Sequence, residues 1–392
     1  MRSLDPDSIL SGQSAPLSAA ERRIGPGIAR GWARLARQRW HSVLGGALVA
    51  LVASSVAPAS AQGPREALGA GAEGRGSTPS LDAASAEPTV APGLVTEPWF
   101  TGPLIAPGAT TLDAGDISLQ PFLSGGTALA SEAVHGRVNP EGNTAAGLEF
   151  DIDVSVGLTD RFTLTISPAG VVGFVDQEQS FAGFGDLPVE LQAQLWRGRH
   201  GWLVPDLLLH VEESFPTGAY QRLDSNTEAI GSGSFITTMG LTGGRLWHLH
   251  DEMWLHLLGD LSGAVGSEVE VQGINTYGGD PATRGRVDPG DFIELQFGAE
   301  LSLTRQWAVA LDLEMIWVGA STFRADRVRS RPDLPQAVVA TGLPASSLLS
   351  FAPALEYSVS ADFGFIGGLW VGVAGRNSPT FVTGVFSTVW TF

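Results

Sequence analysis

The end of the chain places aromatic residues on one face of an extended segment. Residues 383–392 read Thr-Gly-Val-Phe-Ser-Thr-Val-Trp-Thr-Phe, so Phe386, Trp390 and Phe392 point to the same side of a strand. An aromatic face of this kind suits the last strand of a β-barrel, which shows that face to lipid. The segment therefore predicts a protein that crosses a membrane with strands rather than with helices.

Alternation of apolar and polar residues dominates the sequence upstream of this segment. In residues 148–158 and 293–301, for example, Leu, Ile, Phe and Val alternate with Glu, Asp, Gln and Gly. A period of two residues is typical of strands with one apolar and one polar face. The pattern predicts twelve strands, near residues 115–123, 148–158, 161–169, 186–196, 202–214, 234–247, 253–264, 290–303, 307–318, 347–359, 364–375 and 381–392.

The connections between the predicted strands alternate between short and long, except for the last one. The short turns fall near 159–160, 197–201, 248–252, 304–306 and 360–363, and the long loops at 124–147, 170–185, 215–233, 265–289 and 319–346. A membrane barrel with both ends in the periplasm requires this alternation. Tryptophans flank the short turns or the end of the last strand, as expected of a membrane-edge girdle: Trp196, Trp202, Trp247, Trp254, Trp307 and Trp390. We therefore expect residues 97–392 to form an all-β fold, a transmembrane antiparallel up-and-down β-barrel of the outer membrane.

The N-terminal residues have the features of a targeting segment. Six arginines between Arg22 and Arg39 precede an apolar run, 43–57, and Ala59-Ser60-Ala61 follows it. A charged region, a short apolar region and an A-x-A site together predict a cleaved signal peptide at residues 1–61. Residues 62–96 are rich in Gly, Ala, Ser, Pro and Glu, which predicts a disordered periplasmic lead-in.

Composition limits the partners and the chemistry. The chain has no cysteine, which excludes disulfides and thiolate metal sites. Its net charge of −18 argues against nucleic acid as a partner, because phosphate binding needs clustered cations. We expect outer-membrane lipids and a small-molecule solute as partners, together with the barrel assembly machinery, which would bind the strand that ends at Phe392.

The polar faces of the predicted strands are strongly acidic, and they point into the barrel. An isolated buried carboxylate is costly, so we expect water, ions or a basic ligand to reach many of these groups. This favours a hydrated, acid-lined passage for cations or neutral solutes over a barrel filled by hydrogen-bonded side chains. The pore-lining candidates are Glu149, Asp151, Asp153, Glu190, His210, Glu212, His256, Asp260, Glu294, Glu300, Asp312, Glu314 and Glu356.

The sequence shows no catalytic, metal or cofactor site. His210 and Ser214 share a strand face, but four residues of strand separate them by about 13 Å, too far for a nucleophile–base pair. Acidic residues of the long 265–289 loop could bind Ca²⁺, although a solvated loop is the more common explanation. We therefore predict a protein that is not an enzyme and carries no cofactor; a hydrolase is the weakest alternative.

Three short motifs resemble one group of bacterial proteins. Residues 97–107 read Glu-Pro-Trp-Phe-Thr-Gly-Pro-Leu-Ile-Ala-Pro, and 213–218 and 353–357 read Glu-Ser-Phe-Pro-Thr-Gly and Pro-Ala-Leu-Glu-Tyr. With residues 113–122, they resemble outer-membrane β-barrels related to the transporters of phenol meta-cleavage pathways. The resemblance covers roughly 97–392 and implies a pore or uptake barrel for small organic molecules, hydrophobic or aromatic ones included. It brings no catalytic residues. A barrel for structure or surface recognition, without transport, remains the alternative.

Overall fold

The structure is a computed structural model, which describes residues 97–132, 138–140, 145–175, 178–198, 205–225, 228–325 and 341–392. The predicted signal peptide, the predicted lead-in and Trp202 lie outside these residues. Among the described residues, no helix is long and apolar enough to cross a membrane. Neighbouring strands of the main sheet pair antiparallel, and the fold is all-β, as predicted.

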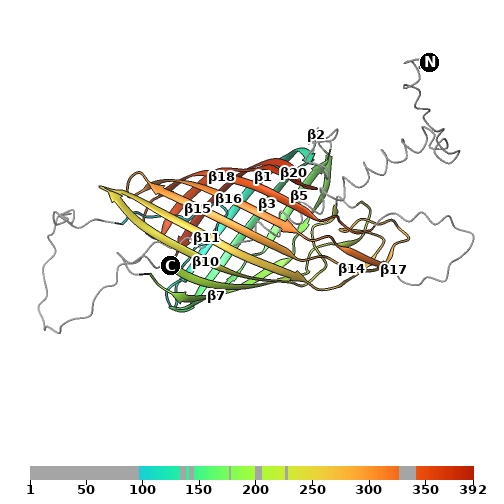
Figure 1. Cartoon of the computed structure of the whole chain (residues 1–392), viewed down its shortest axis with the longest axis horizontal. Helices are drawn as coiled ribbons and strands as arrows, with labels where there is room; N and C mark the ends of the chain where they lie inside the picture. The colour runs from blue at the N-terminus through green and yellow to red at the C-terminus, as the bar shows by residue number, and fades with distance from the viewer. Residues whose placement is uncertain are drawn as a thin grey trace, which may run out of the picture. The chain divides into compact units, whose positions relative to one another are not determined.

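Twelve strands form the wall of a barrel, and they are inclined to its long axis (Figure 1). Two of the twelve are interrupted, so that each is made of two elements. In order around the barrel they are β1 (Ile117–Glu132), β3 (Ala145–Thr159), β4 (Phe162–Ile166) with β5 (Ala169–Val175), β7 (Leu187–Trp196) with β6 (Glu178–Phe184), β8 (Asp206–Phe215), β10 (Ile236–His250), β11 (Met253–Gly266), β15 (Phe292–Ser302), β16 (Trp307–Val318), β18 (Ser346–Ser358), β19 (Phe363–Arg376) and β20 (Pro379–Thr391).

The first and last strands close the barrel. β1 pairs with β3 on one side and with β20 on the other, where Ser118 lies opposite Thr391. Ile117 and Phe392 exchange both of their backbone hydrogen bonds. A closed barrel satisfies its backbone N–H and C=O groups without an open edge, which is what a strand-built protein needs in hydrocarbon. The C-terminal segment is therefore the closing strand that the sequence predicted.

The barrel wall is taller than predicted on one side. The segment 170–185, predicted as a long loop, forms β5 and β6, and β1 extends through part of the predicted 124–147 loop. Pro168 and the pair Gly185–Asp186 interrupt these strands, which explains the error, since such residues usually mark turns. Pairing continues through the break, because Ile152 N donates to Pro168 O and Gly185 N donates to Ala169 O.

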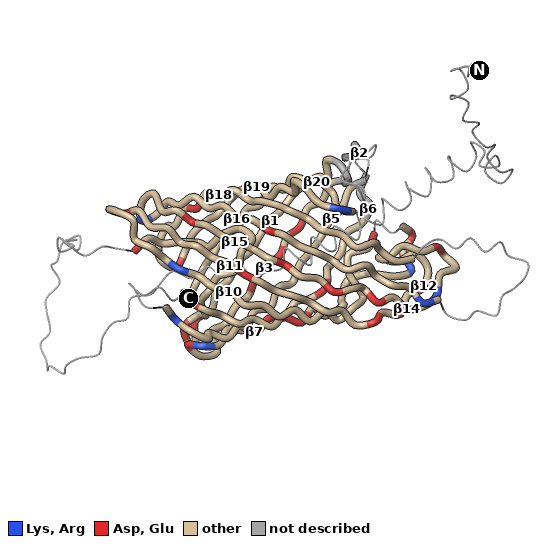
Figure 2. The backbone as a smooth tube through the Cα atoms, in the orientation of Figure 1, with Lys and Arg blue, Asp and Glu red and all other residues tan. Residues whose placement is uncertain are grey.

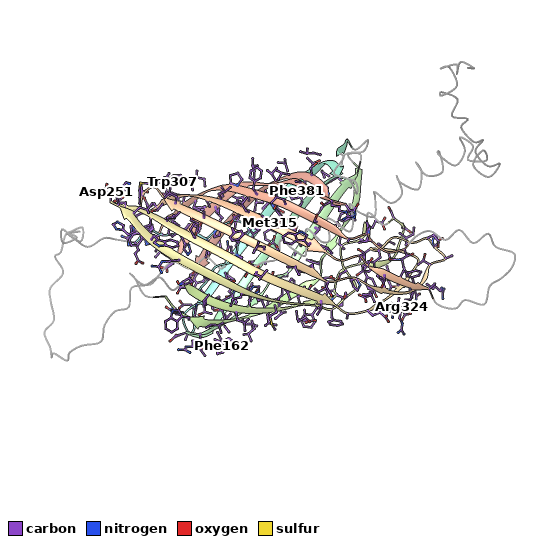
Figure 3. The ribbon with its side chains drawn as sticks, in the orientation of Figure 1. Phe162, Asp251, Trp307, Met315, Arg324 and Phe381 are labelled. Carbon is purple, nitrogen blue, oxygen red and sulfur yellow. The ribbon has the colours of Figure 1, made fainter. Side chains whose placement is uncertain are left out.

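The outer surface has the apolar belt expected of a membrane barrel. Phe150, Leu311 and Phe386 are about half exposed, as are many other outward-facing apolar residues along the strands. Trp196, Trp307 and Trp390 are also exposed near the end of the barrel that carries the short turns. Figure 3 shows Trp307 at the same end as Asp251 of the β10–β11 turn. The wall therefore has a lipid-facing belt with a tryptophan girdle at one edge.

Trp254 departs from the predicted girdle. Its side chain is buried and packs against Phe100 and Ala308. The error arose because Trp254 flanks a short turn but lies on the inward face of β11, where alternation places it in the lumen. The girdle prediction is wrong for this residue.

The long loops build a folded cap at the opposite end. It contains the short strands β9 (Gln221–Leu223), β12 (Val269–Gln272), β13 (Ile274–Asn275), β14 (Arg284–Asp288) and β17 (Thr322–Ala325); β2 (Val138–Pro140) pairs with β1. Tyr277 is buried in the cap and donates its hydroxyl to Ser232 O at 2.8 Å. Burial raises the pKa of Tyr277 above its ordinary value, which keeps the hydroxyl a donor.

The acidic residues of the 265–289 loop have partners within this cap. The Glu268 carboxylate accepts hydrogen bonds from Arg286 and Arg324, each at 3.1 Å. Arg286 and Arg324 therefore supply counter-charges to Glu268. The described residues contain no group of three or more His, Asp or Glu placed to hold a metal ion.

The lipid belt predicts that an outward charge will be costly only near the membrane centre. Leu313 lies on the outer face of β16, and Leu303 lies at the turn that follows β15. We expect Leu313→Arg to lower the free energy of unfolding by about 2–4 kcal/mol, and Leu303→Arg by about 0–1 kcal/mol. Urea titration in lipid vesicles, followed by tryptophan fluorescence, measures both. Equal costs for the two variants would contradict the assigned membrane position.

Candidate functional site in the barrel lumen

A segment that precedes the first strand crosses the lumen. Residues 99–112, here called the plug, are almost entirely buried. Trp99 N donates to Arg305 O in the β15–β16 turn, and Thr111 Oγ1 donates to Asp160 O in the β3–β4 turn. These turns lie on opposite sides of the ring of strands. The plug therefore spans the barrel from wall to wall near the end that carries the short turns.

Wall carboxylates hold the plug by its backbone. Asp312 accepts hydrogen bonds from the N–H groups of three successive plug residues, Leu104, Ile105 and Ala106, at 2.9, 3.3 and 3.4 Å. Glu356 Oε2 accepts from the Thr101 N–H at 2.8 Å and from the Thr101 hydroxyl at 2.9 Å. Both carboxylates are fully buried. We expected water, ions or a basic ligand to satisfy these groups; the protein's own backbone supplies the donors instead.

Polar side chains on the other side of the ring hold the second half of the plug. Gln194 Oε1 accepts from the Thr111 N–H, and Thr163 Oγ1 accepts from the Leu112 N–H, both at 2.9 Å. Arg197 donates to the Thr111 carbonyl at 3.3 Å. Buried hydrogen bonds therefore fix the plug at both ends of its path, and they fix it to side chains that point inward from the wall.

Glycines make room in the wall where the plug passes. A Cβ on Gly298 would lie 3.0 Å from the Cβ of Ala106, and a Cβ on Gly368 would lie 2.6 Å from Leu104. Clashes with the plug would also follow from a Cβ on Gly157, Gly244 or Gly364. These glycines come from four different strands, β3, β10, β15 and β19. The wall is thus shaped to accept this segment over its whole length.

On the cap side of the plug, three lumenal carboxylates surround a buried histidine. His210 Nε2 lies 3.0 Å from Asp260 Oδ1, and His210 Nδ1 lies 3.4 Å from Glu190 Oε2. The imidazole reaches from β8 to β11 across β10, because Gly240 of β10 has no side chain in its way. Glu212 interacts electrostatically with this group. Sequence reasoning named His210 as a pore-lining candidate, and it missed Gly240, which makes the crossing possible.

Residues of β3 extend the acidic surface. Asp153 accepts a hydrogen bond from Ser167 at 2.6 Å and interacts electrostatically with Glu190. Glu149 and Asp151 follow on the same face and are partly exposed. With the His210 group they form the acidic wall of the lumen, which is made of β3, β7, β8 and β11. In Figure 2, acidic positions (red) lie along the strands of the barrel and the arginines (blue) gather towards its two ends.

A second histidine lies beside the plug. His256 Nδ1 is 2.6 Å from Glu300 Oε2, and the imidazole packs against the Phe100 ring at a centroid distance of 5.7 Å. Glu300 is fully buried and lies near Glu356. The structure therefore separates the two histidines: His210 lies on the cap side of the plug, and His256 lies against the plug.

The opposite wall of the lumen is apolar. Its buried residues come from β16, β18, β19 and β20, and the plug residues Leu104 and Ile105 pack against them: Ile316, Leu348, Ala352, Ile366, Trp370 and Phe381. Trp370 and Phe381 meet edge to face with ring centroids 5.3 Å apart. The lumen thus has an acidic wall and an apolar, aromatic wall. Sequence reasoning described only the first, although weak alternation in 364–375 was a signal of the second.

Glu294 and Glu314 mark the boundary between the two walls. Trp370 Nε1 donates to Ser350 Oγ at 2.8 Å, and Ser350 donates to Glu314 Oε2 at 2.6 Å. Glu294 Oε1 accepts from Gln296 at 2.6 Å, and the Glu294 carboxyl faces that of Glu314. Glu314 Oε1 is buried and has no donor among the described residues.

These contacts leave no place for the chemistry of a serine hydrolase at His210. Both ring nitrogens of His210 face carboxylates. Ser214 lies four residues farther along β8, where it pairs with Ile236 at the start of β10. The two exposed histidines of the β10–β11 turn, His248 and His250, interact with Asp251 of the same turn. None of these histidines forms a nucleophile–base pair in the described residues.

Comparison with known proteins shows the fold. No protein family matches the chain, and no curated protein does. The COG4313 outer membrane channel from Pseudomonas putida F1 is similar in structure, with a TM-score of 0.55 and 17% identity, over 72% of this chain and 98% of that one. The NanC porin has a TM-score of 0.34 and 9% identity over 69% and 98%. The TodX monoaromatic hydrocarbon channel has a TM-score of 0.30 and 10% identity over 71% and 90%.

The fold and the lipid-facing belt define the class of the protein. A closed antiparallel barrel with an apolar outer face and an aromatic girdle is the architecture of outer-membrane proteins. The protein is an outer-membrane β-barrel of twelve strands whose lumen is crossed by the plug, the segment that precedes β1.

Side chains at the wall glycines should displace the plug. We expect Gly298→Val to expose the plug, since Ala106 and Pro103 occupy the space of the new side chain. Gly259→Val is the matched control, because Gly259 lies on the outer face of the neighbouring strand and its Cβ would meet Phe297 and the Gln296 carbonyl at ordinary contact distances. Hydrogen–deuterium exchange of a peptide covering residues 101–112 should rise at least severalfold in the first variant alone. Unchanged protection in Gly298→Val would contradict a plug held by close packing.

Proposed function

We propose that the protein is a passive channel or uptake barrel for small solutes, with a preference for cations and neutral molecules. The observation that carries this proposal is the acidic wall. In the described part of the lumen, the ion pairs of the carboxylates involve histidine rather than arginine. Carboxylates without fixed cations attract mobile cations and repel anions.

Organic molecules are the solute class that the lumen supports best. The apolar wall around Trp370 and Phe381 gives a hydrocarbon or aromatic group a surface to contact inside the barrel. The resemblance to transporters of phenol meta-cleavage pathways points to the same class. The structural similarity to an outer membrane channel from Pseudomonas putida agrees with a transport role.

Passage requires the plug to move or to rearrange. It is held at both ends by buried hydrogen bonds, and it lies across the lumen. It is nevertheless a segment without regular secondary structure, held by side chains rather than by strand pairing. Segments of this kind open at lower free energy than the strands around them. The closed form seen here is therefore the resting state of the proposed channel.

The ends of the chain serve targeting and assembly in this proposal. Residues 1–61 are a signal peptide that is removed, residues 62–96 are the periplasmic lead-in to the barrel, and residues 97–392 are the barrel domain. The aromatic strand that ends at Phe392 is the segment that the barrel assembly machinery recognises. The A-x-A site and the closing position of β20 support these assignments.

Ion selectivity tests the proposed function. In a planar bilayer with a KCl gradient, we expect single openings and a reversal potential of the sign that favours K⁺. Glu149→Gln combined with Glu212→Gln should move that potential toward zero, because it removes two lumenal charges. Glu270→Gln, on the exposed face of the cap, is the control and should leave the potential unchanged.

Two results would overturn the proposal. A purified, folded barrel without any resolvable opening, together with unchanged solute entry into liposomes, would favour a structural or surface-recognition barrel. A preference for Cl⁻ would exclude the acidic wall as the conducting surface.

A further inference from the structure

The occupant of the lumen in the structure indicates what the lumen can bind. Leu104 and Ile105 of the plug lie against the apolar wall, and their N–H groups donate to the Asp312 carboxylate. This part of the plug therefore combines an apolar body with several hydrogen-bond donors directed at one carboxylate. A small molecule with the same combination would satisfy the same surfaces once the plug has moved.

We propose that the boundary between the two lumenal walls, around Glu314, Trp370 and Phe381, is a binding site for organic ammonium ions that carry an apolar or aromatic group. This inference rests on the proposed function and names a solute class for it. The ammonium would bind between the carboxylates of Glu314 and Glu294, and its apolar group would lie on the Trp370–Phe381 side. Asp312, once free of the plug, is the next carboxylate along β16.

An oxygen without a partner supports the charged half of this site. Glu314 is fully buried, yet Glu314 Oε1 has no hydrogen-bond donor in the described residues. The neighbouring Glu294 carboxyl interacts directly with that of Glu314, so a cation bound here would meet both carboxyls. A buried carboxylate without a counter-charge is unfavourable, so a bound cation would offset a cost that the described residues leave uncompensated.

The aromatic pair supports the other half of the site. Trp370 is joined to Glu314 through Ser350 by two short hydrogen bonds, so the indole and the carboxylate are held next to one another. Phe381 reaches Trp370 across Gly372, whose missing side chain leaves room for its ring. Aromatic faces attract ammonium ions and also pack well on apolar groups. A carboxylate beside two aromatic rings is therefore suited to an organic cation.

Other ligand classes fit this place less well. A metal ion would need several oxygen or nitrogen ligands around it, and the described residues contain no such group of three. An anion would meet the carboxyls of Glu294 and Glu314. A neutral hydrocarbon would bind the aromatic side but leave the Glu314 oxygen without a partner.

Calorimetric titration of the detergent-solubilised barrel tests the inference with three probes. They are 2-phenylethylammonium, the neutral 2-phenylethanol and ethylammonium, which separate the charge from the apolar group. We expect 2-phenylethylammonium to bind about tenfold more tightly than either of the others, since a charge-assisted hydrogen bond adds roughly that much. Gly298→Val should raise its affinity, because the displaced plug no longer competes for the site.

Two substitutions locate the site. Glu314→Gln should reduce the affinity for 2-phenylethylammonium to that of the alcohol, and Trp370→Leu should weaken both aromatic probes alike. Glu270→Gln in the cap is the control and should change neither. Folding of each variant is checked by the difference in gel mobility between unheated and heated protein on a denaturing gel. If one of the two variants fails to fold, the other still tests the site.

The results separate this inference from the proposed function. Equal affinity for the ammonium and the alcohol, or an unchanged affinity in Glu314→Gln, would overturn the ammonium site even if the barrel conducts ions. Selective ammonium binding that depends on Glu314 supports the site even if no conductance is found, because binding is measured without transport.

Discussion

The closure of the wall is the constraint on which the rest of this structure depends. A strand in hydrocarbon cannot leave its N–H and C=O groups without partners, so the ring must be complete. β20 completes it by pairing with both β19 and β1, down to the exchange of hydrogen bonds between Ile117 and Phe392. Once the ring is closed, alternation along each strand decides which side chains meet lipid and which enter the lumen. The acidity of the lumen follows directly from that alternation.

Carboxylates that face inward then need hydrogen-bond partners. Hydroxyl groups of the wall donate to some of them, such as Asp153 and Glu314, and three further arrangements occur. Backbone N–H groups of the plug satisfy Asp312 and Glu356, and imidazoles face Glu190 and Glu300. A third group, which includes Glu314 Oε1, stays without a donor. The first two arrangements explain how the lumen is held together, whereas the third marks the place that most favours a cation from solution.

Sequence reasoning succeeded where a strict period of two residues applied. It found the closing strand and the twelve-strand wall, because alternation alone determines them. It failed where glycine and proline interrupt the pattern, as at Pro168 and Gly185, since these residues mark turns in most proteins. It also misplaced Trp254, which flanks a turn but faces inward.

The lumenal contacts were beyond the reach of sequence reasoning for a different reason. Whether Asp312 meets water or the Leu104 N–H depends on the path of a segment that has no regular structure. The glycines at 244, 298 and 368 make room for that path, but in the sequence they resemble ordinary strand glycines of a barrel. His210 likewise needed the bare Gly240 on the intervening strand to reach Asp260. Both cases depend on pairs of residues far apart in the chain.

The plug explains how a lumen with two dissimilar walls can be stable when no solute is present. An apolar wall exposed to water and an acidic wall deprived of it would each be costly. Leu104 and Ile105 cover the first, and the N–H groups of the same residues donate hydrogen bonds to the buried Asp312 carboxylate. A solute can replace the plug at a small net cost only if it offers both kinds of contact. The selectivity of the barrel would then arise from competition with its own chain as much as from the charge of its wall.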